Sequence, residues 1–204
     1  LYLDPDDAES PATTAKHAKK LLDKQEEKDV GEDQIEIFAS GGKGFHITVP
    51  QEVFMTKPPK AGLAGLPAIY KEMAYQLAVD SMDFRVYTAR KGRMFRMPNV
   101  KRPNDLYKVQ ITYEELSTLA SIEDKAEAEA AYRQMCSSPR PLHPVEVAAL
   151  EVAPGLLADF DMAKTKVGKA SKGRKKKPTV LPKELPSFAA LLEGRGVKAD
   201  AGFH

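Results

Sequence analysis

Two acidic side chains lie one residue apart near the start of the chain, and a third precedes a later apolar segment. Asp4 and Asp6 occur in YLDPDD, and Asp83 begins DFRVYTA. On an extended backbone the side chains of residues i and i+2 point the same way, so Asp4 and Asp6 would share one side of a strand end. Paired carboxylates favour a bound cation, and oxygen ligands suit hard divalent ions such as Mg²⁺. The alternative for DPDD is a solvated turn, because Asp and Pro both favour turns.

The stretch SGGKGFH, residues 40–46, gathers groups that bind anions. Ser40 supplies a hydroxyl, the glycines allow close approach to the backbone N–H groups, and Lys43 and His46 supply an ammonium and an imidazole. Such an array suits phosphate oxygens, although the spacing of a Walker loop is absent. The alternative is a glycine hairpin followed by a strand histidine that forms a local hydrogen bond.

Basic side chains follow the third acid in MDFRVYTARKGRMFRMPNVKR, residues 82–102. Guanidinium groups match the geometry of phosphate oxygens. Arg93 and Arg96 are three residues apart in sequence. In a regular strand, residues at that spacing point to opposite faces, so these two cations need not lie together. The alternative is a basic strand edge that discourages aggregation. The candidate cations are Arg93, Arg96, Lys101 and Arg102.

The elements that must position these residues have the pattern of an α+β fold. Ser10 followed by Pro11 predicts a helix N-terminus, and further helices are predicted at 66–79, 113–120 and 123–136. Alternating apolar residues or short apolar runs predict strands at 1–4, 34–40, 45–49, 83–89, 93–98 and 107–112. This order predicts one mostly antiparallel sheet with helices packed on one face.

The composition is that of a globular protein, with 42% hydrophobic and 29% charged residues among 204. No run approaches the ~20 apolar residues of a membrane span. Cys136 is the single cysteine, which excludes an internal disulfide and favours a reducing, cytoplasmic setting. Residues 164–177, the basic strap, hold eight cations and no acid, which leaves 23 basic against 29 acidic residues elsewhere. The body of the protein is therefore mildly acidic.

In this order and at these separations, YLDPDD, SGGKGFH and the 82–102 stretch resemble the three signature motifs of the archaeo-eukaryotic primase superfamily. The form they resemble most is that of phage and plasmid primase-polymerases, and the resemblance covers residues 1 to about 116. It implies an RRM-like catalytic core at 1–136 without its N-terminal part, an irregular basic linker at 137–180, and the start of a C-terminal helical primase domain at 181–204.

The resemblance implies a DNA primase-polymerase, which makes primers from NTPs or dNTPs on a single-stranded DNA template. A helicase domain or another replication protein is a further expected partner, and a bacterial or phage-infected cytoplasm is the expected location. Family members usually carry an additional segment before the first motif, so we expect this chain alone to be less than fully active. The implied catalytic residues, which hold two Mg²⁺ or Mn²⁺ ions, are Asp4, Asp6 and Asp83. The implied nucleotide-binding residues are Ser40, Gly41, Lys43, His46, Arg93 and Arg96, and those for nucleic acid are Lys101 and Arg102.

Two other functions remain open. The end-joining polymerases attached to bacterial ligases belong to the same superfamily and share similar acidic and glycine motifs. The other alternative is a non-catalytic RRM-like module that binds nucleic acid, in which KGFHITV would stand in for the aromatic RNA-binding motif. That alternative leaves the three acids without a role.

Overall fold

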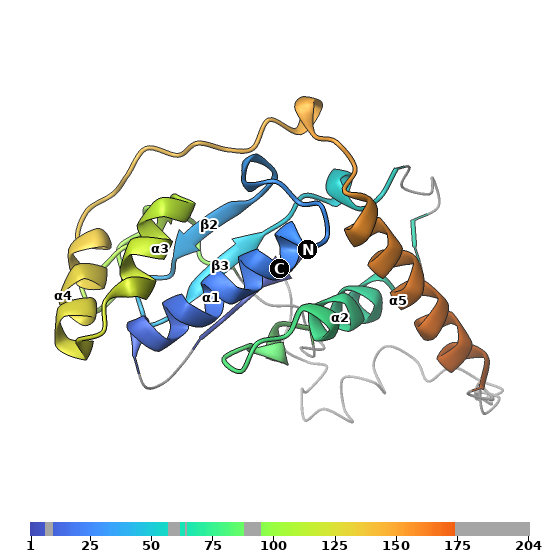
Figure 1. Cartoon of the computed structure of the whole chain (residues 1–204), viewed down its shortest axis with the longest axis horizontal. Coiled ribbons are helices and arrows are strands. Elements are labelled where there is room, and N and C mark those ends of the chain that lie inside the picture. Colours follow the sequence, from blue (N-terminus) through green and yellow to red (C-terminus); the bar gives the residue numbers. More distant parts are fainter. Residues whose placement is uncertain (7–9, 57–61, 64, 88–94, 174–204) are drawn as a thin grey trace, which may run out of the picture. The chain divides into compact units, whose positions relative to one another are not determined.

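The computed structural model describes residues 1–6, 10–56, 62–63, 65–87 and 95–173. The chain divides into two compact units, Leu1–Lys169 and Ala170–His204. Of the second unit, only residues 170–173 are described, and they are helical. The described part contains a four-stranded antiparallel sheet and five α-helices, so the predicted α+β class is confirmed (Figure 1).

The sheet has the strand order β1-β3-β2-β4, and every neighbouring pair is antiparallel. The strands are β1 (Tyr2–Leu3), β2 (Glu36–Ala39), β3 (Phe45–Thr48) and β4 (Val109–Ile111). β2 and β3 form the predicted hairpin, in which Phe38 lies opposite His46. On its other side β2 pairs with β4, and Phe38 lies opposite Gln110. These pairings bring two segments distant in sequence, β1 and β4, alongside the hairpin that contains the glycine turn.

The two faces of the sheet differ in chemistry because side chains alternate along each strand. One face forms the core with Leu3, Ile37, Phe45, Ile47, Val109 and Ile111, all buried. On this side lies helix α1 (Pro11–Glu26), which contacts β3 and helix α3 (Tyr113–Ser121; Figure 1). The opposite face carries polar and aromatic side chains, among them Tyr2, Asp4, Phe38, His46, Lys108 and Gln110. The residues with candidate chemistry therefore face away from the core.

The helices begin at the capping residues that the sequence provides. Ser10 Oγ accepts the Thr13 N–H at 3.2 Å at the start of α1. Thr112 and Glu115 form a reciprocal capping box at the start of α3. Helix α2 spans Leu66–Leu77 and helix α4 spans Lys125–Met135, so these four helices lie where they were predicted. None of the helices in the described ranges is both long enough and apolar enough to cross a membrane.

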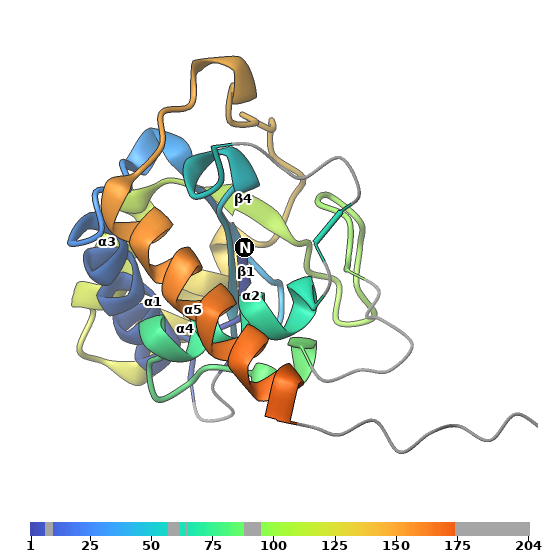
Figure 2. The same ribbon diagram turned by 90° about the vertical axis from the view of Figure 1, so that its right-hand side faces the viewer.

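Within the linker predicted at 137–180, residues 154–173 form a helix, α5 (Pro154–Gly173), which corrects that part of the expectation. The α5 side chains Leu156, Phe160 and Ala163 are buried, and the Phe160 ring centroid lies 5.7 Å from that of Phe54. Figure 2 shows the part of α5 within the first unit beside α2. These apolar residues recur at the spacing of an amphipathic helix. The lysines that follow them made the segment read as a charged linker in the sequence. Residues 174–180 and the helical domain start predicted at 181–204 lie outside the described residues.

A second correction concerns the segment after Asp83, predicted as a strand. Phe84–Tyr87 instead forms a short 3₁₀ helix, η3. The Asp83 carboxylate accepts the backbone N–H of Arg85 at 2.8 Å, a local hydrogen bond that competes with extended pairing. Of the strand predicted at 93–98, residues 95–98 are described, and they belong to no strand.

Candidate functional site

The glycine turn, residues 40–44, connects β2 to β3 and is stabilised by hydrogen bonds to the side chain of its own first residue, Ser40. Ser40 Oγ accepts the N–H groups of Gly42 at 3.1 Å and of Gly44 at 3.3 Å. Gly41 has φ +70°, and a Cβ there would lie 2.6 Å from the Tyr107 carbonyl oxygen. The turn therefore needs glycine both for its backbone angle and for the close approach of the neighbouring chain. The Ser40 hydroxyl, predicted to bind nucleotide, shapes this turn in the structure.

Helix α4 supports the turn through a buried tyrosine. Tyr132 Oη donates to the Gly44 carbonyl at 2.9 Å and lies 3.4 Å from Ser40 Oγ. Burial raises the pKa of Tyr132, so its hydroxyl keeps its proton and remains a donor. The sequence predicted a helix at 123–136 but gave no sign of this contact.

Replacing Tyr132 with phenylalanine should lower the free energy of unfolding by about 1–3 kcal/mol, because the buried Gly44 carbonyl loses its donor. Urea denaturation would measure the loss. Tyr70→Phe is the matched control, because the half-buried Tyr70 ring packs on Phe54 and its hydroxyl has no hydrogen-bond partner among the described residues. Equal stability of the two variants would contradict a role for Tyr132 in holding the turn.

The first acid and the strand histidine face each other across β1 and β3. The register that pairs Leu3 with Ile47 continues to Asp4 and His46, and Asp4 Oδ1 lies 3.7 Å from His46 Nε2. Both side chains are mostly buried, with 17% and 15% of their surfaces exposed. His46 Nδ1 is buried and has no hydrogen-bond partner among the described residues.

His46 is neutral at physiological pH. Burial is the main cause that lowers its pKa to about 3, and the positive charges of Lys108, Arg102 and Arg96 act in the same direction. The contact with Asp4 is therefore between a carboxylate and a neutral imidazole, and 3.7 Å is longer than a direct hydrogen bond. The neutral His46 imidazole therefore lies close enough to three cations, Lys108, Arg102 and Arg96, for their charges to act on it.

The third acid reaches the first through backbone pairing. Pro5 and Met82 form an isolated antiparallel bridge, and the Asp83 N–H donates to the Asp4 carbonyl at 2.8 Å. In the same bridge the Asp6 N–H donates to the Ser81 carbonyl at 2.8 Å. The backbones of Asp83 and Asp4 are therefore adjacent, although the two residues are far apart in sequence.

The exposed Arg85 lies among the three acids. Its Nε is 2.9 Å from Asp83 Oδ1. The hydrogen bond and charge of Asp83 raise the pKa of Arg85, and Asp6 and then Asp4 contribute smaller effects of the same sign. The guanidinium thus takes the position of a counter-cation for this acidic group.

Aspartate oxygens suit a hard divalent cation such as Mg²⁺ or Mn²⁺. In the described ranges, however, no group of three His, Cys, Asp or Glu side chains is arranged to hold a metal ion. Asp6 is exposed beside the turn, where a Cβ on Gly44 would lie 3.0 Å from Asp6 Oδ1. Carboxylate oxygens are the ligands expected for Mg²⁺ or Mn²⁺. For Asp83 to bind such an ion, its carboxylate would have to give up its ion pair with Arg85.

Lys108 is a further residue of the site, and the sequence motifs do not include it. It lies on the polar sheet face, its residue surface is only 4% exposed, and its Nζ is 4.5 Å from the centre of the Phe38 ring. Nζ also donates to the Arg96 carbonyl at 3.3 Å. Burial lowers the pKa of Lys108, while the charges of Asp4 and Glu36 oppose this effect. In YKVQIT the apolar residues Val109 and Ile111 alternate with Lys108 and Gln110. This alternation could have predicted that Lys108 lies on the face of the sheet that points away from the core.

The predicted cations lie at different places around the site. The Arg102 guanidinium packs on the glycine turn, where Nη1 donates to the Ser40 carbonyl at 2.6 Å. Arg96 is exposed within charge range of His46, and Lys43 is exposed in the turn. Lys101 lies at the surface in an ion pair with Asp105 at 2.8 Å. Arg93 lies outside the described residues.

Aromatic side chains border the site. The Tyr2 ring lies 5.3 Å from the His46 ring and 4.3 Å from the Phe95 ring, measured between centroids. Phe95 is 53% exposed, as expected of a surface on which another planar group could stack.

Comparisons of the chain with protein-family models, with curated proteins and with solved structures found no match.

Proposed function

We propose that this chain is the catalytic part of a primase-polymerase, a nucleotidyltransferase that extends or starts a strand on single-stranded DNA. The observation that carries the proposal is the meeting of Asp4 and Asp83 beside a glycine turn whose histidine lies among three cations. Acids for divalent ions and cations for phosphate are the two requirements of nucleotidyl transfer. We further propose that the α+β fold is the RRM-like form of the archaeo-eukaryotic primase superfamily.

In the proposed reaction the 3′-hydroxyl oxygen of a primer attacks the α-phosphorus of a nucleoside triphosphate. A new P–O bond forms, the bond to the pyrophosphate breaks, and the hydroxyl proton is lost to solvent or a base. Asp4, Asp6 and Asp83 would hold Mg²⁺ or Mn²⁺, which would activate the hydroxyl and neutralise the leaving group. Arg102 and Lys108 would attract the triphosphate, and the neutral His46 would donate one N–H to a phosphate oxygen.

The polar face of the sheet favours a catalytic role over that of an RRM-like module that binds nucleic acid by base stacking. An RRM reads bases with exposed aromatic rings on its sheet. Phe38, at the centre of this face, is only 7% exposed, and the Lys108 ammonium lies over its ring. Tyr2 and Phe95 remain at the border, where they could support a template base. The end-joining polymerases of the same superfamily share the acids and the turn, so this site does not favour either polymerase class.

Substituting Lys108 with methionine should weaken triphosphate binding about tenfold, because Met keeps the packing on Phe38 and removes the ammonium. Isothermal titration with a non-hydrolysable dNTP would measure the change. Lys101→Met is the matched control, because Lys101 is exposed and its ammonium pairs with Asp105. A nucleotide affinity in Lys108→Met equal to that of wild type would contradict a phosphate-binding role for this residue.

The proposed activity is tested by primer extension on single-stranded DNA with Mg²⁺ or Mn²⁺, in which labelled dNTPs are compared with NTPs. We expect products whose sequence follows the template, and no products when a chelator removes the cation. A second reaction without primer would show whether the chain also starts strands. Absence of template-dependent product with either cation and either kind of nucleotide would contradict the proposal.

A further inference from the structure

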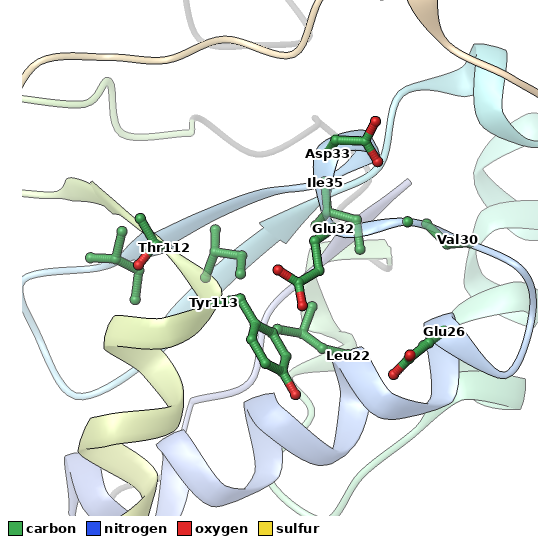
Figure 3. Close-up of a pocket in the computed structure, with 11 residues that line it drawn as sticks. Leu22, Glu26, Val30, Glu32, Asp33, Ile35, Thr112 and Tyr113 are labelled. Carbon is green, nitrogen blue, oxygen red and sulfur yellow. The ribbon is translucent and has the colours of Figure 1, made fainter.

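A cavity of about 460 Å³ opens on the core side of the sheet, opposite the face that carries Asp4 and His46 (Figure 3). It lies at the end of the layer between α1, β2 and the start of α3. Ile37 and Ile111 belong to the core face of the sheet, and the Tyr113 ring lies at the N-terminus of α3. The apolar walls consist of Leu22, Val30, Ile35, Ile37, Ile111 and Tyr113.

Three exposed carboxylates, those of Glu26, Glu32 and Asp33, surround this apolar cavity. Figure 3 shows the Glu32 side chain directed into the cavity, toward Tyr113. No Lys or Arg in the described ranges pairs with any of the three. The nearby Lys19 is already held by Asp23, 3.0 Å from its Nζ, and lies over the Tyr113 ring. The cavity therefore combines an apolar interior with an uncompensated negative rim.

We propose that this cavity binds a partner protein through a short cationic segment with one or two apolar anchor side chains. Charge complementarity selects the occupant, because the three acids attract lysine or arginine and repel the phosphates of nucleic acid. An apolar pocket of this size accommodates a leucine-sized anchor, while the rim holds the flanking cations. The proposal does not depend on nucleotidyl transfer. Because the cavity and the acids of the site lie on opposite faces of the sheet, both could be occupied together.

The test uses the full chain and a fluorescein-labelled peptide in which two lysines stand on each side of two leucines. Fluorescence anisotropy at low salt should show saturable binding. A peptide with serines in place of the leucines should bind at least about fivefold more weakly, because it lacks the anchor. A peptide with glutamates in place of the lysines should not bind. If the serine peptide binds as tightly as the leucine peptide, the apolar walls are unused and the proposal is overturned.

Variants of the protein locate the binding. Changing Glu26 and Glu32 together to lysine should weaken the leucine peptide about tenfold or more. Both residues are exposed, so the change should leave the thermal unfolding midpoint nearly unaltered. The control changes Glu127 and Glu129, exposed on α4, to lysine, which alters the net charge equally. A weakening confined to the Glu26 and Glu32 variant supports the proposal, whereas equal weakening in both variants would mean general attraction by the acidic surface and overturn it.

Discussion

Asp83→Asn should reduce nucleotide incorporation about 1,000-fold, because it removes one negative charge from the proposed cation site, where an ion contributes several kcal/mol to transition-state stabilisation. Asparagine keeps the size of the side chain and an oxygen that can still accept the Arg85 N–H, now 2.8 Å from Asp83 Oδ1. The turn that begins η3 should therefore survive, and binding of single-stranded DNA should be unchanged. Steady-state incorporation of a labelled dNTP would measure the loss.

Asp80→Asn provides the control for this prediction. Asp80 is exposed, lies three residues before Asp83, and has no ion pair among the described residues. Its substitution makes the same chemical change in the same segment and should leave incorporation near the wild-type rate. If Asp83→Asn retains incorporation, Asp83 does not belong to the catalytic group and the acid pairing through Pro5 and Met82 is only structural.

His46→Ala should weaken nucleotide binding about 10- to 100-fold while leaving the affinity for single-stranded DNA unchanged. The imidazole is neutral and lies among Lys108, Arg102 and Arg96, where it can donate one hydrogen bond to a charged phosphate oxygen. A hydrogen bond to a charged group contributes roughly 1.5–3 kcal/mol, which gives this range of affinity. Titration with a non-hydrolysable dNTP and, separately, with a labelled oligonucleotide would measure the two affinities.

The comparison variant is His143→Ala. The His143 side chain is exposed, and the residue's described hydrogen bonds to Gln110 come from its backbone N–H and carbonyl. This variant should bind nucleotide as tightly as wild type. A loss of DNA affinity equal to the loss of nucleotide affinity in His46→Ala would mean that His46 supports the whole face and does not act on the triphosphate specifically.

Local signals in the sequence were sufficient for most of the fold. Ser10 before Pro11, the helical pattern at 113–120 and the alternation in β2 and β3 each lie within a few residues, and each element formed where it was predicted. Helix α5 was missed because its apolar spacing passes directly into a run of lysines. The strand predicted after Asp83 was wrong because a hydrogen bond from the Arg85 N–H to the Asp83 side chain begins a 3₁₀ helix.

The candidate site depends on contacts that no local pattern contains. The motif resemblance required Asp4 and Asp83 to meet, but the Pro5–Met82 bridge that joins them is a pairing of distant segments. Lys108 becomes a site residue only once β4 is placed beside β2. Tyr132 reaches the glycine turn from a helix that follows it by almost 90 residues in the chain. Register and tertiary packing, and not residue type, determine these contacts.

Electron paramagnetic resonance of Mn²⁺ would show whether Asp4 and Asp83 bind a divalent cation, because it measures cation binding whether or not this chain is fully active. Titrations with and without a non-hydrolysable dNTP would compare wild type with the double variant Asp4→Asn, Asp83→Asn. We expect wild type to bind Mn²⁺ more tightly when the nucleotide is present, and we expect the double variant to lose this binding. Equal Mn²⁺ binding by the two proteins, or none by wild type, would contradict this expectation.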